Sequence, residues 1–202
     1  MDYLLVVICY LLGSISFGYL LGKLLRKVDI RQYGSGSSGA TNTLRVLGPW
    51  IGGTVFVLDV LKGAVSVWLA KNFGTATWII PACAISVVAG HNWPLYFKFK
   101  GGRGAATTLG VVFAISFWIT IVGFAVIVLI IALTRYVSLA SILGGLALPI
   151  VFLVFDFGTE YIIMGIILGI LLLLRHTSNI KRLINGTESK IGQKIDISKK
   201  NK

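Results

Sequence analysis

Long apolar runs separated by short polar segments dominate the chain. The runs cover approximately residues 2–22, 49–70, 74–89, 105–133, 138–155 and 161–174. A membrane-spanning helix needs about 20 predominantly apolar residues, and these runs reach or approach that length. The first run has no basic segment before it and no clear small-residue cleavage site, which favours a retained span over a signal peptide. The pattern predicts an all-α integral membrane protein.

The run at residues 105–133 decides the number of spans. As one helix it would be about 43 Å long, more than a hydrocarbon core of about 30 Å requires. If it crosses twice and the N-terminus is outside, nearly all basic residues lie inside, while Asp2, Lys71, Asp156 and Glu160 lie outside. Cytoplasmic loops are enriched in Lys and Arg. The sequence therefore predicts about seven transmembrane helices with a cytoplasmic C-terminus, with six or five as alternatives.

Composition narrows the class of protein further. The chain is 56% hydrophobic and 13% charged, with a formal net charge of +12. No polar linker divides it, so we expect residues 1–202 to form one membrane-embedded domain, with residues 190–202 as a flexible basic tail. The basic residues flank apolar runs, as expected for membrane topology and contact with anionic lipid, and no nucleic-acid recognition module is present. Nucleic-acid binding is therefore not expected.

The cysteines and histidines do not indicate a metal or a cofactor. Cys9 and Cys83 both lie within apolar runs, where they read as small buried hydrophobes. His91 and His176 are the only histidines, and neither has a second Cys or His at ligand spacing. We expect no metal site and no cofactor.

The first polar segment, GSGSSGATNTLR at residues 34–45, has the composition of a phosphate-binding loop. It matches a dinucleotide fingerprint and a P-loop without its lysine, but both need a structural context that flanking membrane helices do not supply. Glycines permit positive φ, so that successive N–H groups can form an anion-binding nest, and Arg45 offers a bidentate fork. The other candidate ligands are Gly34, Ser35, Gly36, Ser37, Ser38, Gly39, Thr41 and Asn42. The alternative is a flexible glycine–serine linker.

The second polar segment, GHNWPLYFKFKGGRGAATTLG at residues 90–110, combines basic residues with a glycine turn. Lys98, Lys100 and Arg103 surround Gly101, Gly102 and Gly104. The apolar residues that follow predict a helix beginning at the turn, and a helix N-terminus favours an anion. The alternative is a basic loop at the membrane edge, shaped by His91 and Pro94.

Two further polar segments are predicted on the same side of the membrane. RHTSNIKRLINGTE, residues 175–188, puts His176 and Asn179 on one helical face, although a lone histidine at a helix end is usually a surface residue. RYVSLAS spans residues 135–141. Together the four segments predict one bound phosphate group, or two, beside the lipid headgroups. Asp59 and Lys62 lie on one face of the second span, as a structural ion pair or a substrate contact.

These four segments, in this order, resemble the bacterial membrane acyl-phosphate:glycerol-3-phosphate acyltransferases. The resemblance rests on GSGSSGATNTLR, GHNWPLYFKFKGGRGAAT, RYVSLAS and RHTSNIKRLINGTE. It implies a seven-helix enzyme of the bacterial cytoplasmic (plasma or inner) membrane, with its active site facing the cytoplasm. The enzyme would transfer a fatty acyl group from acyl phosphate to the sn-1 hydroxyl of glycerol 3-phosphate. The products would be lysophosphatidic acid and phosphate, in the first step of phospholipid synthesis.

The resemblance also implies roles for individual residues. The residues expected to serve catalysis are Ser35, Arg45, His176 and Asn179. The residues expected to bind substrate are Gly34, Gly36, Gly39, Thr41, Asn42, Lys100, Gly101, Gly102, Arg103, Gly104 and Ser141. Glu188 is expected to maintain the structure. Ser37 and Arg103 replace the family's more frequent asparagine and lysine, which puts one loop hydrogen bond and the geometry of one phosphate contact in question.

The chemistry requires no covalent acyl-enzyme, because phosphate is already a good leaving group. The protein must hold two phosphate anions and orient a hydroxyl against a carbonyl. The base is either His176 or a substrate phosphate oxygen, and we favour the phosphate. We expect a monomer whose partners are its two substrates and membrane lipid. The alternatives are a transporter of a phosphorylated anionic metabolite, disfavoured because no internal repeat is evident, and a scaffold whose basic rim binds anionic lipid.

Overall fold

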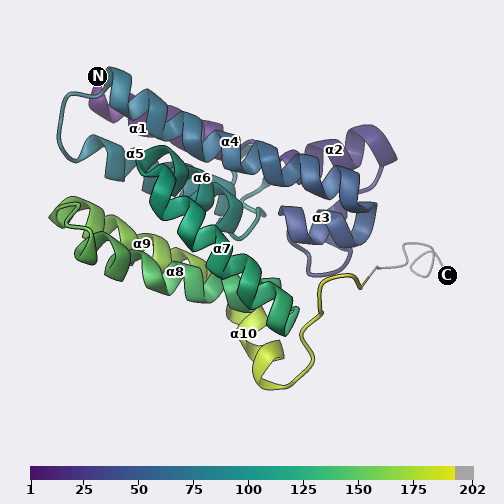
Figure 1. Cartoon of the computed structure of the whole chain (residues 1–202). Helices are drawn as coiled ribbons and strands as arrows, with labels where there is room; N and C mark the ends of the chain where they lie inside the picture. Colours follow the sequence, from purple (N-terminus) through teal and green to yellow (C-terminus); the bar gives the residue numbers. More distant parts are fainter. Residues whose placement is uncertain (194–202) are drawn as a thin grey trace.

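The protein is a bundle of helices, most of which run side by side along one axis (Figure 1). The computed structural model describes residues 1–193, and within them the chain forms ten α-helices and two short 3-10 helices without a strand. The α-helices are α1 (Asp2–Gly13), α2 (Phe17–Arg26), α3 (Ala40–Leu47), α4 (Pro49–Phe73), α5 (Ile79–Asn92), α6 (Ala105–Ile115), α7 (Phe117–Thr134), α8 (Val137–Val154), α9 (Thr159–Arg175) and α10 (Thr177–Ile184). The 3-10 helices are η1 (Ile30–Gln32) and η2 (Leu95–Phe97). The expected all-α architecture is confirmed.

The expected number of seven spans is wrong. Fewer of the described helices are long and apolar enough to cross a membrane. Within residues 1–193, four segments qualify: Asp2–Arg26, Pro49–Phe73, Phe117–Thr134 and Val137–Val154. A fifth qualifies if α9 and α10, which meet at a bend of 62°, count as one broken span. The helix α5 is too short because residues 74–78 form a loop, in which Thr75 and Ala76 donate hydrogen bonds to the carboxylate of Asp2.

The break predicted within residues 105–133 is present, but it is unequal. Ser116 adopts an extended conformation, with φ −147° and ψ 112°, and separates α6 from α7. Helix α6 has 11 residues, so it is about 16 Å long and shorter than the hydrocarbon core. Hydropathy alone did not distinguish this short buried helix from a full span.

Close contact between α4 and α6 fixes the centre of the bundle. A methyl group at Gly63 would overlap the carbonyl oxygen of Thr107, and one at Gly110 would overlap that of Val60. Small residues allow the backbones of membrane helices to approach in this way. The apolar core continues through Val67, Val87, Val111 and Phe152, which are fully buried. This packing places the N-terminus of α6 next to the C-terminus of α5.

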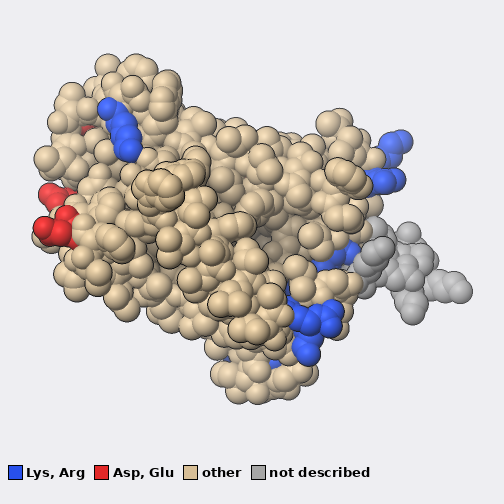
Figure 2. Space-filling view, viewed as in Figure 1, with Lys and Arg blue, Asp and Glu red and all other residues tan. Residues whose placement is uncertain are grey.

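Charge is segregated along the bundle. Lys and Arg gather at the end where α2, α3 and α10 lie, and acidic side chains gather at the opposite end (Figure 2). The N-terminus and the last described residues also lie at opposite ends (Figure 1). The four polar segments predicted from the sequence lie at the basic end.

The first residues of the expected flexible tail, 190–193, make hydrogen bonds in the structure. The backbone N–H of Ile191 donates to the carbonyl of Arg135 at 2.8 Å, and Nη2 of Arg135 donates to the carbonyl of Ile191 at 3.2 Å. The N–H of Lys190 donates to Oε1 of Gln193 at 3.0 Å. Residues 190–193 are therefore held against the α7–α8 connection. The rest of the predicted tail lies outside the described residues.

Candidate active site

The four polar segments meet at the basic end of the bundle, as the sequence predicted. The N–H of Ser38 donates to the carbonyl of Gly101 at 3.4 Å, joining the first segment to the second. Nε of Arg175 donates to the carbonyl of Gly102 at 2.9 Å, which joins the segment at residues 175–188 to the segment at residues 90–110. Oγ of Ser138 donates to Oε1 of Glu188 at 2.8 Å, which joins the segment at residues 135–141 to the segment at residues 175–188. Residues distant in the sequence thus form one polar site.

Asn42 holds the first glycine loop in shape. Its Nδ2 atom donates to the carbonyls of Ile30, Tyr33 and Ser37 at 3.0, 3.1 and 2.8 Å, and its Oδ1 atom accepts from the N–H of Ser35 at 2.9 Å. The side chain is 2% exposed. These bonds occupy the amide and make Asn42 a clamp of the loop, while the residue also lines the larger cavity described below, so its expected contact with substrate stays a prediction.

The loop glycines have two different reasons to be glycine. Gly34 and Gly36 have φ of 61° and 71°, in the left-handed region that glycine adopts at low cost. Gly39 instead has φ −78° and forms the N-cap of α3, so the expected positive φ is wrong there. Gly34 is exposed, whereas Gly36 and Gly39 line cavities described below.

The expected nest of free backbone N–H groups is not formed. In the first loop, the N–H groups of Ser35, Gly36 and Ser38 donate to Asn42, Tyr33 and Gly101. The N–H of Gly39 donates to Oγ of Ser37 at 3.2 Å, so Ser37 supplies a loop hydrogen bond of its own. In the second loop, the N–H of Gly102 donates to the carbonyl of His91 at 3.0 Å. These loop N–H groups are therefore engaged within the protein, and the N–H groups of the first turns of α3 and α6, which border the larger cavity, are separate from them.

Two adjoining cavities lie among the polar segments. The larger, of about 950 Å³, has polar groups at one end and extends between apolar residues of α4, α6, α7 and α8. Its polar lining includes Ser37, Thr41, Arg45, Arg103, Ser141 and His176. The smaller, of about 210 Å³, is lined by Ser35, Gly36, Gly101, Arg103, Arg175 and neighbouring residues. Ser37 and Arg103 line both cavities.

Arg103 is a partly buried cation that has no protein partner for its guanidinium among the described residues. Its guanidinium has no hydrogen bond or salt bridge within the described residues. Burial, together with repulsion from Arg182, Arg45 and Arg175, lowers the pKa of Arg103 to about 10, although Glu188 opposes the shift. Arg103 therefore remains charged at neutral pH. A buried charge without a partner is costly, so an anion that paired with it would be bound favourably.

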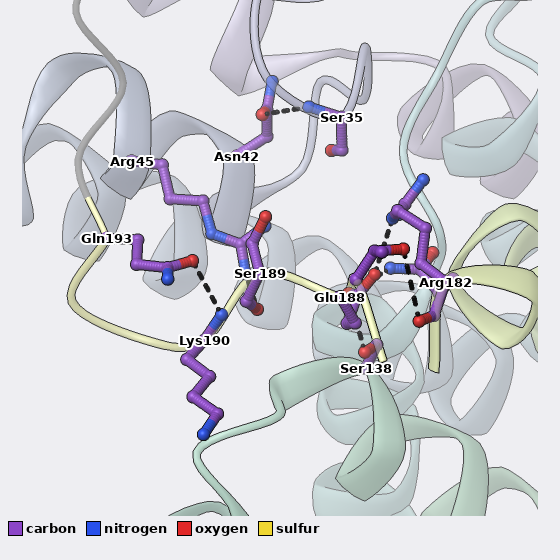
Figure 3. A network of polar contacts seen from close by, with 11 residues as sticks. Ser35, Asn42, Arg45, Ser138, Arg182, Glu188, Ser189, Lys190 and Gln193 are labelled. Carbon is purple, nitrogen blue, oxygen red and sulfur yellow. Dashed lines mark hydrogen bonds and ion pairs between the residues drawn. The ribbon is translucent and has the colours of Figure 1, made fainter. Parts of the chain in front are cut away.

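Arg45 on α3 supplies the second cation of the larger cavity. It is 6% exposed; its Nη2 atom donates to the carbonyl of Ser189 at 2.9 Å, and its buried Nε atom has no partner. Burial lowers the pKa of Arg45 below its ordinary value, and Glu188 partly opposes this. Figure 3 shows the side chain reaching from its helix to the segment that carries Glu188 and Ser189. One face of the guanidinium is thus engaged and a further donor is available.

His176 follows the last residue of α9 and lines the larger cavity. Its Nδ1 atom lies 2.8 Å from the carbonyl oxygen of Leu172. Because a carbonyl only accepts, this contact assigns the proton of the neutral ring to Nδ1 and leaves Nε2 as an acceptor. Burial lowers the pKa of His176 to about 4, although the bond to Leu172 opposes the shift. The ring is neutral at physiological pH.

Glu188 is the centre of a buried network (Figure 3). Its Oε1 atom accepts from Oγ of Ser138 at 2.8 Å and from Nδ2 of Asn179 at 2.6 Å, and its Oε2 atom accepts from Nε of Arg182 at 2.7 Å. Burial alone would raise the pKa of Glu188, but these hydrogen bonds outweigh burial and lower it. The contacts agree with the structural role expected for Glu188.

The remaining expected site residues differ in their relation to the cavities: Asn179 and Lys100 line neither, whereas Gly104 and Ser141 line the larger one. Asn179 is fully buried, binds Glu188 and lines neither cavity, so its contribution passes through Glu188. Lys100 is exposed and also lines neither cavity. Gly104, with φ 85°, forms the N-cap of α6, as the glycine turn predicted. Oγ of Ser141 donates to the carbonyl of Val137 at 2.9 Å while the residue lines the larger cavity.

Sequence reasoning missed Ser138 and the placement of Asp59 and His91. Ser138 lies three residues before Ser141, and this spacing places both on one helical face. The spacing is the feature of the sequence that could have indicated Ser138 as a site residue. Asp59 and His91 line the larger cavity together, although the sequence offered His91 only as a residue that shapes a loop. Within the described residues, no group of three or more His, Cys, Asp or Glu side chains is arranged to hold a metal ion.

Comparison with known proteins identifies the family. The profile of the family "Glycerol-3-phosphate acyltransferase" matches residues 3–186. A glycerol-3-phosphate acyltransferase of Thermoanaerobacter pseudethanolicus is 47% identical over 194 residues, covering 96% of this chain and 98% of its own. One of Halalkalibacterium halodurans is 44% identical over 200 residues, covering 96% and 97%.

Solved structures show the same fold. The crystal structure of PlsY (YgiH), an integral membrane glycerol 3-phosphate acyltransferase, in its glycerol 3-phosphate form has a TM-score of 0.90 and 43% identity. The match covers 95% of this chain and 96% of that one. The lysophosphatidic acid form of PlsY has a TM-score of 0.87 and 42% identity, with the same coverage. The match extends across the loops and helices that carry the site, and this chain belongs to the glycerol-3-phosphate acyltransferase family of integral membrane proteins.

Proposed function

We propose that this protein transfers a fatty acyl group from acyl phosphate to the sn-1 hydroxyl of glycerol 3-phosphate. The products are lysophosphatidic acid and inorganic phosphate, in the first step of phospholipid synthesis. The observation that carries the proposal is that one cavity is lined by cationic side chains in one part and by apolar side chains in the rest. Arg45 and Arg103 lie at its polar end, and the rest extends among apolar residues of four helices. Such a cavity fits an acyl chain that ends in an anionic group.

The two arginines receive different substrates in this proposal. Arg103 binds the phosphate of glycerol 3-phosphate, since it lines both cavities and has no protein partner among the described residues. Arg45 binds the phosphate of the acyl donor at the mouth of the apolar region. Ser35 supports binding from the smaller cavity, where its buried Oγ atom has no partner. Two cations for two anions also reduce the repulsion between the substrates.

The reaction needs one new bond and one broken bond. The sn-1 hydroxyl oxygen attacks the acyl carbonyl carbon, the bond between that carbon and the phosphate oxygen breaks, and phosphate departs with the electron pair. A phosphate oxygen accepts the hydroxyl proton. The neutral His176 offers Nε2 as an acceptor that positions glycerol 3-phosphate, and the proton of the attacking hydroxyl stays free to reach the phosphate oxygen. The arginines stabilise negative charge on the carbonyl oxygen and on the departing phosphate, and no covalent acyl-enzyme forms.

The protein acts in the bacterial cytoplasmic membrane with its active site facing the cytoplasm. The segregation of Lys and Arg to the site end of the bundle (Figure 2) supports this orientation, because basic loops are retained on the cytoplasmic side. We expect the protein to act as a monomer. The apolar region of the cavity lies between helices, which supports entry of the acyl chain from the bilayer.

Phosphate release tests the proposal directly. Purified protein in detergent is supplied with palmitoyl phosphate and glycerol 3-phosphate, and lysophosphatidic acid is followed in parallel. Release should require both substrates and be lost in Arg45→Ala, and palmitoyl-CoA should not replace palmitoyl phosphate. If folded protein turned over palmitoyl-CoA instead, the proposed donor would be wrong. If neither donor were used, a transport function would become the better explanation.

A further inference from the structure

Three buried ionisable side chains lie beneath the second glycine loop. Asp59 and Lys62 belong to α4, and His91 belongs to the last turn of α5. Their exposed fractions are 1%, 3% and 5%. Ionisable groups are expensive in a membrane protein, and they are rarely retained where an apolar residue would pack as well. The cluster therefore calls for a role beyond filling space.

The cluster links the α1–α2 break to His91. Nζ of Lys62 donates to the carbonyls of Gly13 and Ile15 at 3.1 and 2.9 Å. Nζ also lies 2.8 Å from Oδ1 of Asp59, as the sequence suggested for this pair. The same Oδ1 atom lies 3.4 Å from Nδ1 of His91. Lys62 thus fixes the carboxylate, which lies beside Nδ1 of the imidazole ring, although no hydrogen bond joins Oδ1 and Nδ1.

His91 contacts Gly102 through both its backbone and its ring. Its carbonyl accepts the N–H of Gly102 at 3.0 Å. A methyl group at Gly102 would overlap Nε2 of His91, and its next two contacts would also be ring atoms of His91. Gly102 does not have a positive φ, so its backbone conformation does not require glycine. The ring requires it, because the loop backbone lies directly against the imidazole.

The contact matters because Arg103 is the next residue. Nε of Arg175 donates to the carbonyl of Gly102. Gly102 is therefore fixed between His91 and Arg175, and this determines the direction from which Arg103 enters the two cavities. A displaced loop would move the guanidinium, and a misplacement of about 1 Å can reduce a rate on the order of a hundredfold.

We propose that His91, oriented by Asp59 and Lys62, is a positioning residue that aims Arg103 at the phosphate of glycerol 3-phosphate. The inference rests on the proposed function, which assigns that phosphate to Arg103. It goes further because it adds three buried residues, Asp59 and Lys62 of α4 and His91 of α5, to the residues that serve substrate binding. Asp59, Lys62 and His91 act through Gly102, and none of them needs to touch the substrate.

The test is a double-mutant cycle between His91 and Gly102, with each substrate titrated separately. His91→Ala should raise KM for glycerol 3-phosphate on the order of tenfold, the value of one charge-assisted contact, and leave KM for palmitoyl phosphate within about twofold. Gly102→Ala should have the same selective effect, because the added methyl displaces the ring. The double variant should be no worse than His91→Ala, because the clash is then absent. Asp59→Asn should weaken glycerol 3-phosphate binding in the same direction.

Controls separate this inference from general destabilisation and from the proposed function. Ser86→Ala removes a 2.7 Å bond from α5 to the carbonyl of Val6 without touching the loop, and it should leave both KM values unchanged. Arg103→Gln should raise KM for glycerol 3-phosphate; if it does not, the assignment of Arg103 fails. If Arg103→Gln has this effect but the His91 and Gly102 variants do not, or if their losses add independently, the inference is overturned. Binding of glycerol 3-phosphate, measured calorimetrically, gives the same comparison for any variant without turnover.

Discussion

Nη2 of Arg45 lies 2.9 Å from the carbonyl oxygen of Ser189, so one donor of the arginine assigned to the acyl donor contacts the C-terminal segment. The same segment carries Glu188, which Ser138, Asn179 and Arg182 hold in place. A phosphate is a stronger partner for a guanidinium than a backbone carbonyl is. The contact therefore orients Arg45 through one donor while Nε has no protein partner.

Replacement of Arg45 should distinguish its geometry from its charge. Arg45→Lys keeps the charge but loses the fork, so we expect kcat/KM to fall roughly 10- to 100-fold, with KM for palmitoyl phosphate raised. Arg45→Ala should be essentially inactive. Steady-state assays of phosphate release measure both. The matched control is Lys98→Asn, which removes an exposed positive charge at a residue with φ 57°, a conformation asparagine tolerates. Full activity in Arg45→Lys would contradict a bidentate contact.

The pH dependence of His176→Gln should identify its role. Because the pKa of His176 is about 4, the ring is neutral throughout pH 6–8 and should contribute no change in charge there. We expect His176→Gln to reduce kcat roughly 10- to 100-fold, as expected when an orienting hydrogen bond is lost, while the shape of the profile stays that of the unmodified protein. The measurement is kcat/KM from pH 5.5 to 8.5. A limb near pH 6.5 that disappears with the histidine would make His176 the base.

The network around Glu188 should make stability depend on acid pH. Its pKa is lowered in the folded protein from an ordinary value of 4.5, so its stabilising contribution is complete above that pH and is lost as pH falls through the lowered value. Glu188→Gln should therefore be less stable than the unmodified protein at pH 7, with the difference shrinking below about pH 4.5. Thermal unfolding in detergent between pH 3 and 7 measures this. A difference that stays constant with pH would show that the carboxylate charge does not matter.

Asn42→Asp should destabilise the first loop before it affects substrate affinity. The substitution replaces an Nδ2 that donates to three carbonyls with an oxygen that repels them. A buried group left unsatisfied costs about 1–3 kcal/mol, so unfolding should shift several degrees downward. Asn72→Asp is the matched control, because exposed Asn72 makes one bond within its own helix, to the carbonyl of Trp68. A large rise in KM with unchanged unfolding would restore Asn42 as a ligand.

Some conclusions followed from the sequence because they depend on local pattern. Apolar runs indicated a helical membrane protein, and four polar segments with glycine and arginine indicated phosphate chemistry. A break within residues 105–133 was also predicted, but its position at Ser116 came only from the structure. Hydropathy overestimated the spans, because it does not detect where a helix actually begins and ends, as α5 and α6 show.

The sequence by itself determined which residue types were available and that they gather at one end of the bundle. The tertiary structure decided which of them face the cavities. Arg45 and Arg103 line the larger cavity, Arg175 lines the smaller cavity while it donates to two loop carbonyls, and Asn179 lines neither. Asn42 lines the larger cavity, but its amide is bonded to the loop. The physical reason is that the hydrogen-bond partner of a polar side chain fixes where that side chain points. The partner of Arg45, Ser189, lies 144 positions away in the sequence. Only helix packing brings such partners together.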